Sequence, residues 1–310
     1  MTIQAPTLDK RDLRRLELFR EIVEQGGISN AIHSTGLSQP VLSNQLITLE
    51  KSLGVSLCKR GRSGFELTDE GRSVYNYANE ISAMLTEYAF KLKGVHSTLS
   101  GHVRVGCLDN TATLTNNPLL KAIEQFYQLS DDVEVTLDVG DYTQLNEKLL
   151  SGQLDMMLCV LGDRQRAAFE FATPLFIEQS QLYARKDLAE QIIANHYILS
   201  GCRINMGGYA VDTMKALLNI EQHPGVKLYN GWHVESGLML TLAGSHLSFL
   251  PTHLIEQNRA CQHLVALQPD KWKLESQFYL ITKGKPSTLS SAARAFTDLL
   301  NTVAKESNDQ

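Results

Sequence analysis

Hydrophobic residues near the N-terminus recur at the spacing of an α-helix. Between positions 13 and 23 they lie three or four residues apart, which predicts an amphipathic helix that ends at Gly26-Gly27. Ser29 is placed to cap a short second helix that runs to about Thr35. Gly36 follows, where a tight turn between two helices needs a residue that tolerates positive φ.

A third helix is expected directly after this turn. Ser38 supplies its N-cap, and Pro40 lies in its first turn, where a missing N–H costs nothing. Apolar residues keep the helical spacing as far as Leu53, and Gly54 ends the helix. A helix, a glycine turn and a serine-capped helix together have the layout of a helix-turn-helix.

The segment between Val55 and Thr68 has the pattern of a β-hairpin. Two short alternating runs flank a basic tip at residues 61–64, and we interpret this hairpin as a wing. A long helix is expected beyond it, with apolar residues in alternating steps of four and three. These residues are Val74, Ala78, Ile81, Leu85, Tyr88, Leu92 and Val95. A 3.5-residue repeat sustained this long favours pairing of two helices over packing inside the helix's own domain.

After a polar boundary at residues 96–102, strand-like runs alternate with helical ones. The first series places strands at 103–108, 133–139 and 154–161 and helices at 119–129 and 145–150. The second places strands at 180–185, 197–200, 226–229 and 247–250 and helices at 211–220 and 236–243, before a strand at 278–282 and a helix at 289–303. Such βαβ units predict a mainly parallel sheet with helices on both faces, and two α/β lobes rather than one sheet of ten strands.

Composition excludes several classes of protein. Of 310 residues, 43% are hydrophobic and 20% charged, as in ordinary globular proteins, and no apolar run is long enough to cross a bilayer. Residues 1–8 lack the pattern of a secretory signal, so we expect a cytoplasmic protein. The five cysteines contain no C-x-x-C pair and the histidines no H-x-x-x-H pair, which argues against a disulfide framework and a metal site.

The charge is distributed unevenly along the chain. The net charge is -5, but residues 1–100 carry 12 Lys+Arg against 11 Asp+Glu, whereas the remainder carries 17 against 23. Residues 25–65 hold four basic side chains and a single acidic one, Glu50. This local excess fits a small DNA-contacting surface attached to an acidic body.

The N-terminal motifs resemble those of the LysR-type transcriptional regulators. The segments that carry the resemblance are Gly27-Ile-Ser-Asn-Ala31, Leu37-Ser-Gln-Pro-Val-Leu-Ser43, Leu49-Glu-Lys-Ser-Leu-Gly-Val55 and Leu67-Thr-Asp-Glu-Gly71. Later pieces such as Phe249-Leu-Pro-x-His253 are similar to the family as well. Asn44 stands where the family commonly has Arg, which changes the expected contacts to a half-site.

The resemblance implies an α/β protein with an α-rich N-terminal part. A winged helix-turn-helix would cover residues 1–68, a linker and dimerisation helix 69–96, and an effector-binding domain like a periplasmic binding protein 101–310. Lobe I of that domain would comprise about 101–174 and 276–310, and lobe II about 175–275. Such regulators act as homodimers or homotetramers on double-stranded promoter DNA, under the control of a small-molecule co-inducer held between the lobes.

The third helix is expected to enter the major groove by its N-terminal end. Gln39 and Asn44 suit adenine, and Pro40 suits a thymine methyl group. Serines there suit phosphates, and arginines on the wing suit the backbone or the minor groove. The residues expected to contact DNA are Ser29, Ser38, Gln39, Pro40, Ser43, Asn44, Arg60 and Arg62.

The effector is expected at the carboxyl ends of strands, near helix N-termini. The residues placed there are Asp109, Asn110, Thr111, Thr113, Ser200, Cys202, Arg203, Trp232, Glu235 and Ser236. Arg203 suits a carboxylate or phosphate, whereas Asp109 and Glu235 suit an amine, so an organic acid and an amino acid both remain open. Thr111 and Ser236 as plain helix caps, Trp232 as a core residue, and Arg203 as a surface residue are alternatives.

An α/β enzyme with an N-terminal DNA-docking domain is the competing hypothesis. The chain has no G-x-S-x-G, no phosphate loop and no G-x-G-x-x-G after a strand, so we assign no catalytic residue, cofactor or metal. Cys202, beside Arg203 in a glycine-flanked loop, is a candidate low-pKa redox thiol, although an inert thiol is favoured.

Overall fold

The computed structural model describes residues 9–61, 64–93, 99–206, 211–231 and 233–308. They form two compact units, one made of the residues up to 89 with 150–153, and the other of the remainder. Among the described residues, no helix is both long and apolar enough to cross a membrane.

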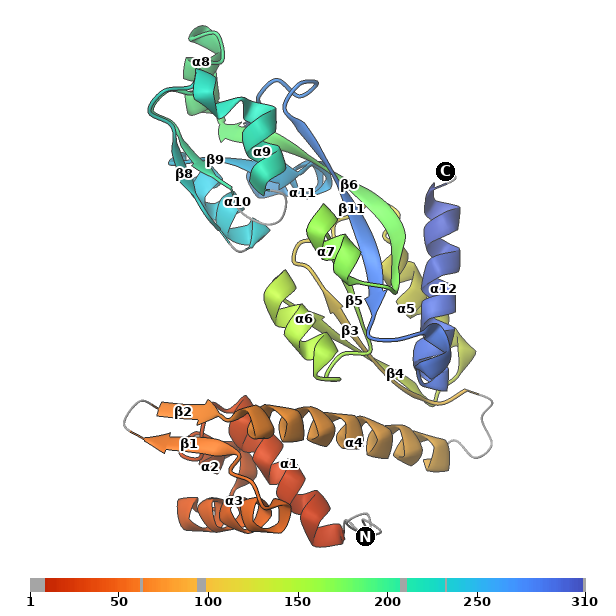
Figure 1. The fold of residues 1–310 in the computed structure, drawn as a ribbon. Coiled ribbons are helices and arrows are strands. Elements are labelled where there is room, and N and C mark those ends of the chain that lie inside the picture. The colour runs from red at the N-terminus through yellow and green to blue at the C-terminus, as the bar shows by residue number, and fades with distance from the viewer. Residues whose placement is uncertain (1–8, 62–63, 94–98, 207–210, 232, 309–310) are drawn as a thin grey trace. The chain divides into compact units, whose positions relative to one another are not determined.

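The first unit has the predicted helix-turn-helix, hairpin and long helix (Figure 1). Its elements are α1 (Lys10–Glu24), α2 (Ala31–Thr35), α3 (Gln39–Leu53), β1 (Cys58–Gly61), β2 (Gly64–Leu67) and α4 (Asp69–Lys93). The strands β1 and β2 pair antiparallel, with Cys58 opposite Leu67. Gly36 ends α2 with φ 68°, as the glycine turn required.

Two details of the helix starts differ from the sequence expectation. α1 begins before residue 13, because the Asp9 carboxylate accepts hydrogen bonds from the backbone N–H groups of Arg11 (2.7 Å) and Asp12 (2.8 Å). Ser29 does not cap α2: its N-cap is Asn30, whose amide donates to the Gln25 carbonyl instead (2.8 Å). Ser38 does occupy the N-cap position of α3, without a side-chain capping bond.

The long helix α4 divides into two halves with different environments. Ala78 is buried in the core of the first unit, and Val74 and Ile81 pack against that core. Leu85, Tyr88 and Leu92 are exposed instead, Leu92 to 76%. The pairing interpretation of the repeat is therefore wrong for its first half, which serves its own domain, and only the second half presents an unburied apolar face; Val95 lies outside the described residues.

Gly71, in the first turn of α4, lies where no side chain fits. A Cβ atom there would be 1.9 Å from the Leu57 carbonyl oxygen. The Thr68 hydroxyl closes the same corner, since it accepts from the Gly71 N–H (2.9 Å) and donates to the Ser56 carbonyl (2.7 Å). This close approach gives a physical reason for the Thr-Asp-Glu-Gly segment.

The second unit is built on one continuous nine-stranded sheet. Its strands are β3 (Gly101–Cys107), β4 (Val133–Val139), β5 (Met156–Val160), β6 (Ala172–Arg185), β7 (Arg203–Asn205), β8 (Lys227–Tyr229), β9 (Leu247–Pro251), β10 (Leu264–Ala266) and β11 (Lys273–Thr282). The order is β4-β3-β5-β11-β6-β9-β7-β8, with β10 beside β6. Pairs at both ends are parallel, but β6 and β11 pair antiparallel with each other and with their other neighbours, so the expectation of a mainly parallel sheet is wrong.

Separate hydrophobic cores make this sheet two-lobed, with one buried cluster in lobe I and two in lobe II. The helices are α5 (Pro118–Leu129), α6 (Tyr142–Leu150), α7 (Asp163–Ala168), α8 (Lys186–Ala194), α9 (Val211–Leu218), α10 (Val234–Leu242), α11 (Thr252–Gln257) and α12 (Ser291–Asn308). In lobe I, α5 and α12 lie side by side, with Phe126 and Phe296 edge to face at 5.2 Å (Figure 1). Lobe II has its own core around Leu182 and Ile204, and β6 and β11 run through both lobes.

The chain between 186 and 205 departs most from the sequence expectation. Residues 186–194 form the unexpected helix α8, and residues 197–200 form no strand. His196 and Tyr197 adopt left-handed φ values of 51° and 61°, which a strand cannot contain. The apolar Tyr197-Ile-Leu run is a loop whose Leu199 is buried, so its hydrophobicity reflects core packing rather than a strand.

Candidate nucleic-acid interface and effector site

The N-terminal end of α3 presents a polar surface. Ser38, Gln39, Pro40 and Asn44 are exposed and Ser43 is half-buried. Leu42, Leu46 and Leu49 on the opposite face are buried against α1 and the hairpin. Among the described residues, the side-chain amides of Gln39 and Asn44 have no hydrogen-bond partner, so both remain available to an external partner.

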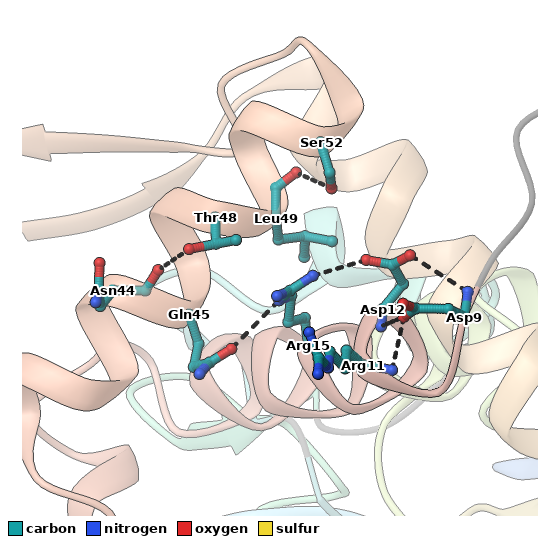
Figure 2. A network of polar contacts seen from close by, with 9 residues as sticks. All are labelled: Asp9, Arg11, Asp12, Arg15, Asn44, Gln45, Thr48, Leu49 and Ser52. Carbon is teal, nitrogen blue, oxygen red and sulfur yellow. Dashed lines mark hydrogen bonds and ion pairs between the residues drawn. The ribbon is translucent and has the colours of Figure 1, made fainter.

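One arginine joins α3 to α1. Figure 2 shows Arg15 of α1 between Asp12 on its own helix (2.9 Å) and Gln45 on α3, whose Oε1 accepts from Nε at 3.3 Å. On α3 itself, the hydroxyl groups of Thr48 and Ser52 donate to carbonyls of the same helix (Figure 2). The helix is therefore held to α1 by Gln45, next to Asn44, which points away from that contact.

The hairpin adds a basic residue that the sequence-based list omitted. Lys59 is exposed on β1 and lies opposite Glu66 on β2. The side chains of Arg60 and Arg62 fall outside the described residues. Ser29 is exposed in the turn before α2. Lys59 was detectable as part of the local basic excess.

In the second unit, a loop of lobe I meets a helix start of lobe II. Asp109 follows β3, and its carboxylate accepts a hydrogen bond from the backbone N–H of Glu235 at the start of α10 (3.3 Å). The same carboxylate lies 3.9 Å from Nδ1 of His233. The structure thus brings together Asp109 and Glu235, which are 126 residues apart in the sequence.

A second bridge between the lobes joins Thr113 to His253. The Thr113 hydroxyl and His253 Nδ1 share a hydrogen bond of 2.9 Å, and His253 Nε2 lies 3.2 Å from a carboxylate oxygen of Glu178. The His253 and Glu178 side chains are only 7% and 2% exposed. Glu178 belongs to β6, which runs through both lobes, so the chain Thr113–His253–Glu178 joins a loop of lobe I to the strand that connects the lobes.

Sequence reasoning did not single out His253 and Glu178 as candidate site residues. His253 belongs to the Phe-Leu-Pro-x-His segment, and its spacing from His246 did not suit a metal site, whereas Glu178 lies in a strand with no motif. Their burial is the signal that marks them, because charged side chains are rarely buried without a partner. No spacing along the chain connects residues that are 75 positions apart.

The remaining predicted residues of these loops have local roles. Asn110 has φ 60°, and its amide donates to the Asp109 carboxylate (2.9 Å). The Thr111 carbonyl accepts from Asn117, the N-cap of α5 (2.8 Å), and the Ser236 hydroxyl donates to the His233 carbonyl (2.6 Å). Trp232 lies outside the described residues.

Ser200, Cys202 and Arg203 do not lie where the sequence placed them. Because residues 197–200 form a loop and β7 begins at Arg203, these side chains lie at the amino end of a parallel strand. Asn205 at the other end of β7 lies beneath α10, next to Gly237. Burial raises the pKa of the Cys202 thiol, which is the opposite of an activated thiolate.

No metal-binding arrangement is evident in the part of the chain that the structure describes. Nowhere in those residues do three or more His, Cys, Asp or Glu side chains form a group that suits a metal ion.

Both units match known protein families. Residues 13–72 match the family described as bacterial regulatory helix-turn-helix protein, lysR family, and residues 96–305 match the LysR substrate binding domain. The HTH-type transcriptional activator BauR of Pseudomonas aeruginosa is 27% identical over 277 residues, which is 88% of this chain and 89% of that protein. The nitrogen assimilation regulatory protein nac of Klebsiella aerogenes is 33% identical over 183 residues, 59% of this chain and 58% of that protein.

Solved structures show the same fold. The crystal structure of CbnR, a LysR family transcriptional regulator, is similar with a TM-score of 0.64 at 17% identity, over 94% of this chain and 99% of that chain. Full-length CbnR in complex with its target DNA gives a TM-score of 0.63 over the same shares. A helix-turn-helix followed by a two-lobed α/β domain is common to these chains.

Proposed function

The chain belongs to the LysR family of transcriptional regulators, and from this premise we propose which of its residues read DNA and which bind the effector. Members of the family bind promoter DNA and small-molecule effectors and form oligomers, and the named relatives are regulators rather than enzymes. The enzyme hypothesis is therefore set aside. We also propose that the protein works in the cytoplasm, where promoter DNA lies. The domain boundaries that we propose are 1–68 for the winged helix-turn-helix, 69–96 for the linker helix and 101–310 for the effector-binding domain.

The DNA contacts are assigned to the exposed start of α3. Gln39 and Asn44 pair with base edges in the major groove, and Pro40 contacts a thymine methyl group. Ser29, Ser38 and Ser43 hydrogen-bond phosphates, while Arg60, Arg62 and Lys59 on the hairpin bind the backbone or the minor groove. This assignment rests on one observation. Among the described residues, the exposed side-chain amides of Gln39 and Asn44 have no hydrogen-bond partner, and they lie on a helix that is hydrogen-bonded to α1.

The effector site is assigned to the loop after β3 and the start of α10. Asp109 and Glu235 offer carboxylates, and the Thr113 hydroxyl, Asn110 and Ser236 lie on the same segments. Carboxylate oxygens accept hydrogen bonds and bear negative charge, so the site suits a ligand with an ammonium group, such as an amino acid. Two contacts already bridge the lobes here, Asp109 to Glu235 and Thr113 to His253.

Regulation follows as a shift between populations. A ligand that contacts both lobes stabilises a closed form, and closure changes the angle between the linker helices of a dimer and the spacing of its two recognition helices. The exposed apolar residues in the second half of α4 supply the dimer contact.

The test is thermal unfolding of the purified protein with a metabolite panel, with and without its own upstream DNA. A ligand at a hundred times its dissociation constant stabilises the protein by about 2.7 kcal/mol, which shifts the melting temperature measurably. We expect an ammonium compound to stabilise the wild type, to lose this effect in Asp109→Asn, and to change the footprint or the bend of the DNA. Identical footprints with and without a saturating ligand would contradict the regulatory mechanism.

A further inference from the structure

Lobe II carries a depression of about 410 Å³ that the proposed effector site does not include. It lies between α8, the loop that leads into β7 and the turn before β9. Arg203 and Cys202 line it, whereas Asp109, Thr113 and Glu235 do not. Volumes of roughly 300–1,000 Å³ are usual for sites that hold small molecules.

One wall of the depression is apolar. Leu188 and Ile192 lie one turn apart on α8, and Ile198 of the following loop lies beside them, with 43% of its surface exposed. Ile192 is anchored in the core of lobe II. This wall provides a surface on which a short hydrocarbon body is removed from water.

The other wall presents solvent-exposed polar groups and a positive charge. Among the described residues, no carboxylate pairs with the Arg203 guanidinium, and the side chains of Gln191, Asn195 and Ser200 have no hydrogen-bond partner. Arg185 at the edge of this region differs, because Asp187 accepts two hydrogen bonds from it, at 2.8 and 2.6 Å. Arg203 is thus the charge that an anion entering the depression would meet.

The positive charge of Arg203 also affects the pKa of a nearby histidine, His246. The His246 side chain is half-buried beside the turn at Ser245, and its pKa is lowered by burial and by the positive charge of Arg203. Lys227, opposite Arg203 on β8, adds a second positive charge outside the lining. The local potential therefore favours an anion over a cation.

The loop that lines the depression is tied to the rest of lobe II by several contacts. The last carbonyls of α8, from Gln191 to Ile193, are occupied by the N–H groups of residues 195–197, so they do not face a ligand. The Tyr197 ring packs edge to face on Trp272 at 6.2 Å, and the Leu199 N–H donates to His223 Nδ1 at 3.3 Å. Two successive left-handed residues are kept in place by these contacts, which is how a site is preorganised.

We propose that this depression binds a carboxylate on a short apolar body, as a second small-molecule site separate from the ammonium site at Asp109. The carboxylate pairs with Arg203 and receives hydrogen bonds from Gln191, Asn195 or Ser200. The hydrocarbon body lies on Leu188, Ile192 and Ile198. The assignment is independent of the effector proposal, since it uses none of the same residues.

The experiment follows the isoleucine methyl groups of the full-length protein by NMR during titration with isobutyrate. Its isosteric amide, isobutyramide, tests the charge, and acetate tests the apolar body. We expect saturable shifts of the Ile192 and Ile198 methyl signals with isobutyrate, weaker binding of acetate, and none of isobutyramide. Arg203→Gln should weaken isobutyrate binding by about 10- to 100-fold, the value of a charge-assisted hydrogen bond.

Two control variants make the result specific. Lys227→Gln removes an equal charge that lies outside the lining, so it should weaken isobutyrate binding far less than Arg203→Gln does. Asp109→Asn alters the proposed effector site and should bind isobutyrate as the wild type does. The proposal would be overturned if no isoleucine methyl signal shifts saturably at isobutyrate concentrations up to about 20 mM, a dissociation constant that corresponds to about 2 kcal/mol of binding free energy. Equal binding of the amide, or equal loss in Lys227→Gln and Arg203→Gln, would overturn it as well.

Discussion

The two units of this protein place their candidate sites on different kinds of structure. In the first unit, the groups proposed to contact base edges lie within one turn and a half of a single helix, α3. In the second, the groups come from a loop after β3, the start of α10, the strand β6 and the helix α11. A site carried by one continuous element depends on local structure, whereas an assembled site depends on the topology of the whole sheet.

The sharpest way to break the assembled site is to replace His253 with leucine. The change removes the imidazole that faces the Glu178 carboxylate, which is 2% exposed, and deletes the bond to Thr113. Loss of one partner of a buried pair costs about 3–5 kcal/mol. Urea denaturation of the full chain should show this loss in the second unit, with DNA binding by the first unit kept at low urea.

The matched control is His253→Gln, whose amide still donates a hydrogen bond toward Glu178. It should cost clearly less than the leucine variant. Equal destabilisation by both would mean that only the volume of the imidazole matters, and the polar chain between the lobes would lose its role.

Within the first unit, Gly71→Ala is expected to have the next largest effect. Its Cβ would lie 1.9 Å from the Leu57 carbonyl oxygen, so the start of α4 must move away from the hairpin, at a cost of about 3 kcal/mol. Gly36→Ala is the comparison, because that position has φ 68° but no atom within 4 Å, and about 1 kcal/mol is expected. Similar melting temperatures for the two variants would show that backbone conformation, not the close contact, decides.

DNA recognition should separate into two kinds of contact. Gln39→Ala should weaken binding to the specific site by about 1–3 kcal/mol and relax the preference at one base pair. Lys59→Ala on the hairpin should weaken binding to all DNA sequences alike. It should also reduce the slope of log affinity against log salt concentration by about one. Band-shift titrations on specific and scrambled DNA at several salt concentrations measure both. Equal losses of specificity would contradict this division.

The smallest effect concerns a local ion pair. The hydrogen bonds from Arg185 lower the pKa of Asp187 to about 2. A carboxyl group whose pKa is lowered by folding contributes stability above its ordinary pKa of 3.8, and this contribution is lost as the pH falls through about 2. Stability curves of the wild type and Asp187→Asn should therefore differ slightly above pH 4 and converge toward pH 2. A constant difference at every pH would assign the effect to something other than this charge.

The sequence predicts the secondary structure of the first unit better than that of the second, for a physical reason. Helix ends in the first unit follow from residues within one turn, such as Gly36 and Gly54, so the helix-turn-helix and the hairpin were predictable. The pairing interpretation of α4 failed at Val74 and Ala78, because an apolar stripe has the same spacing whether it faces another chain or its own domain.

In lobe II, one strand was predicted where the structure has a loop, and three candidate residues, Ser200, Cys202 and Arg203, were misplaced as a result. The Tyr197-Ile-Leu run has the composition of a strand, yet the chain turns left-handed at His196 and Tyr197 and starts β7 at Arg203. Sequence analysis therefore placed Arg203 with Asp109 and left the charge of the ligand open. The structure separates them, and each charge then belongs to its own proposed site.

Local patterns in the chain were enough to establish a winged helix-turn-helix, a long helix and an α/β body, since contacts between near neighbours along the chain dictate those elements. The meeting of Thr113 with His253, 140 residues away, and of His253 with Glu178 was decided only when β6 and β11 joined the two lobes. Burial is also decided only by the tertiary structure. Nothing in the sequence distinguishes Glu178 from an exposed glutamate, but the folded sheet excludes water from its side chain, so that its carboxylate needs a partner within the protein.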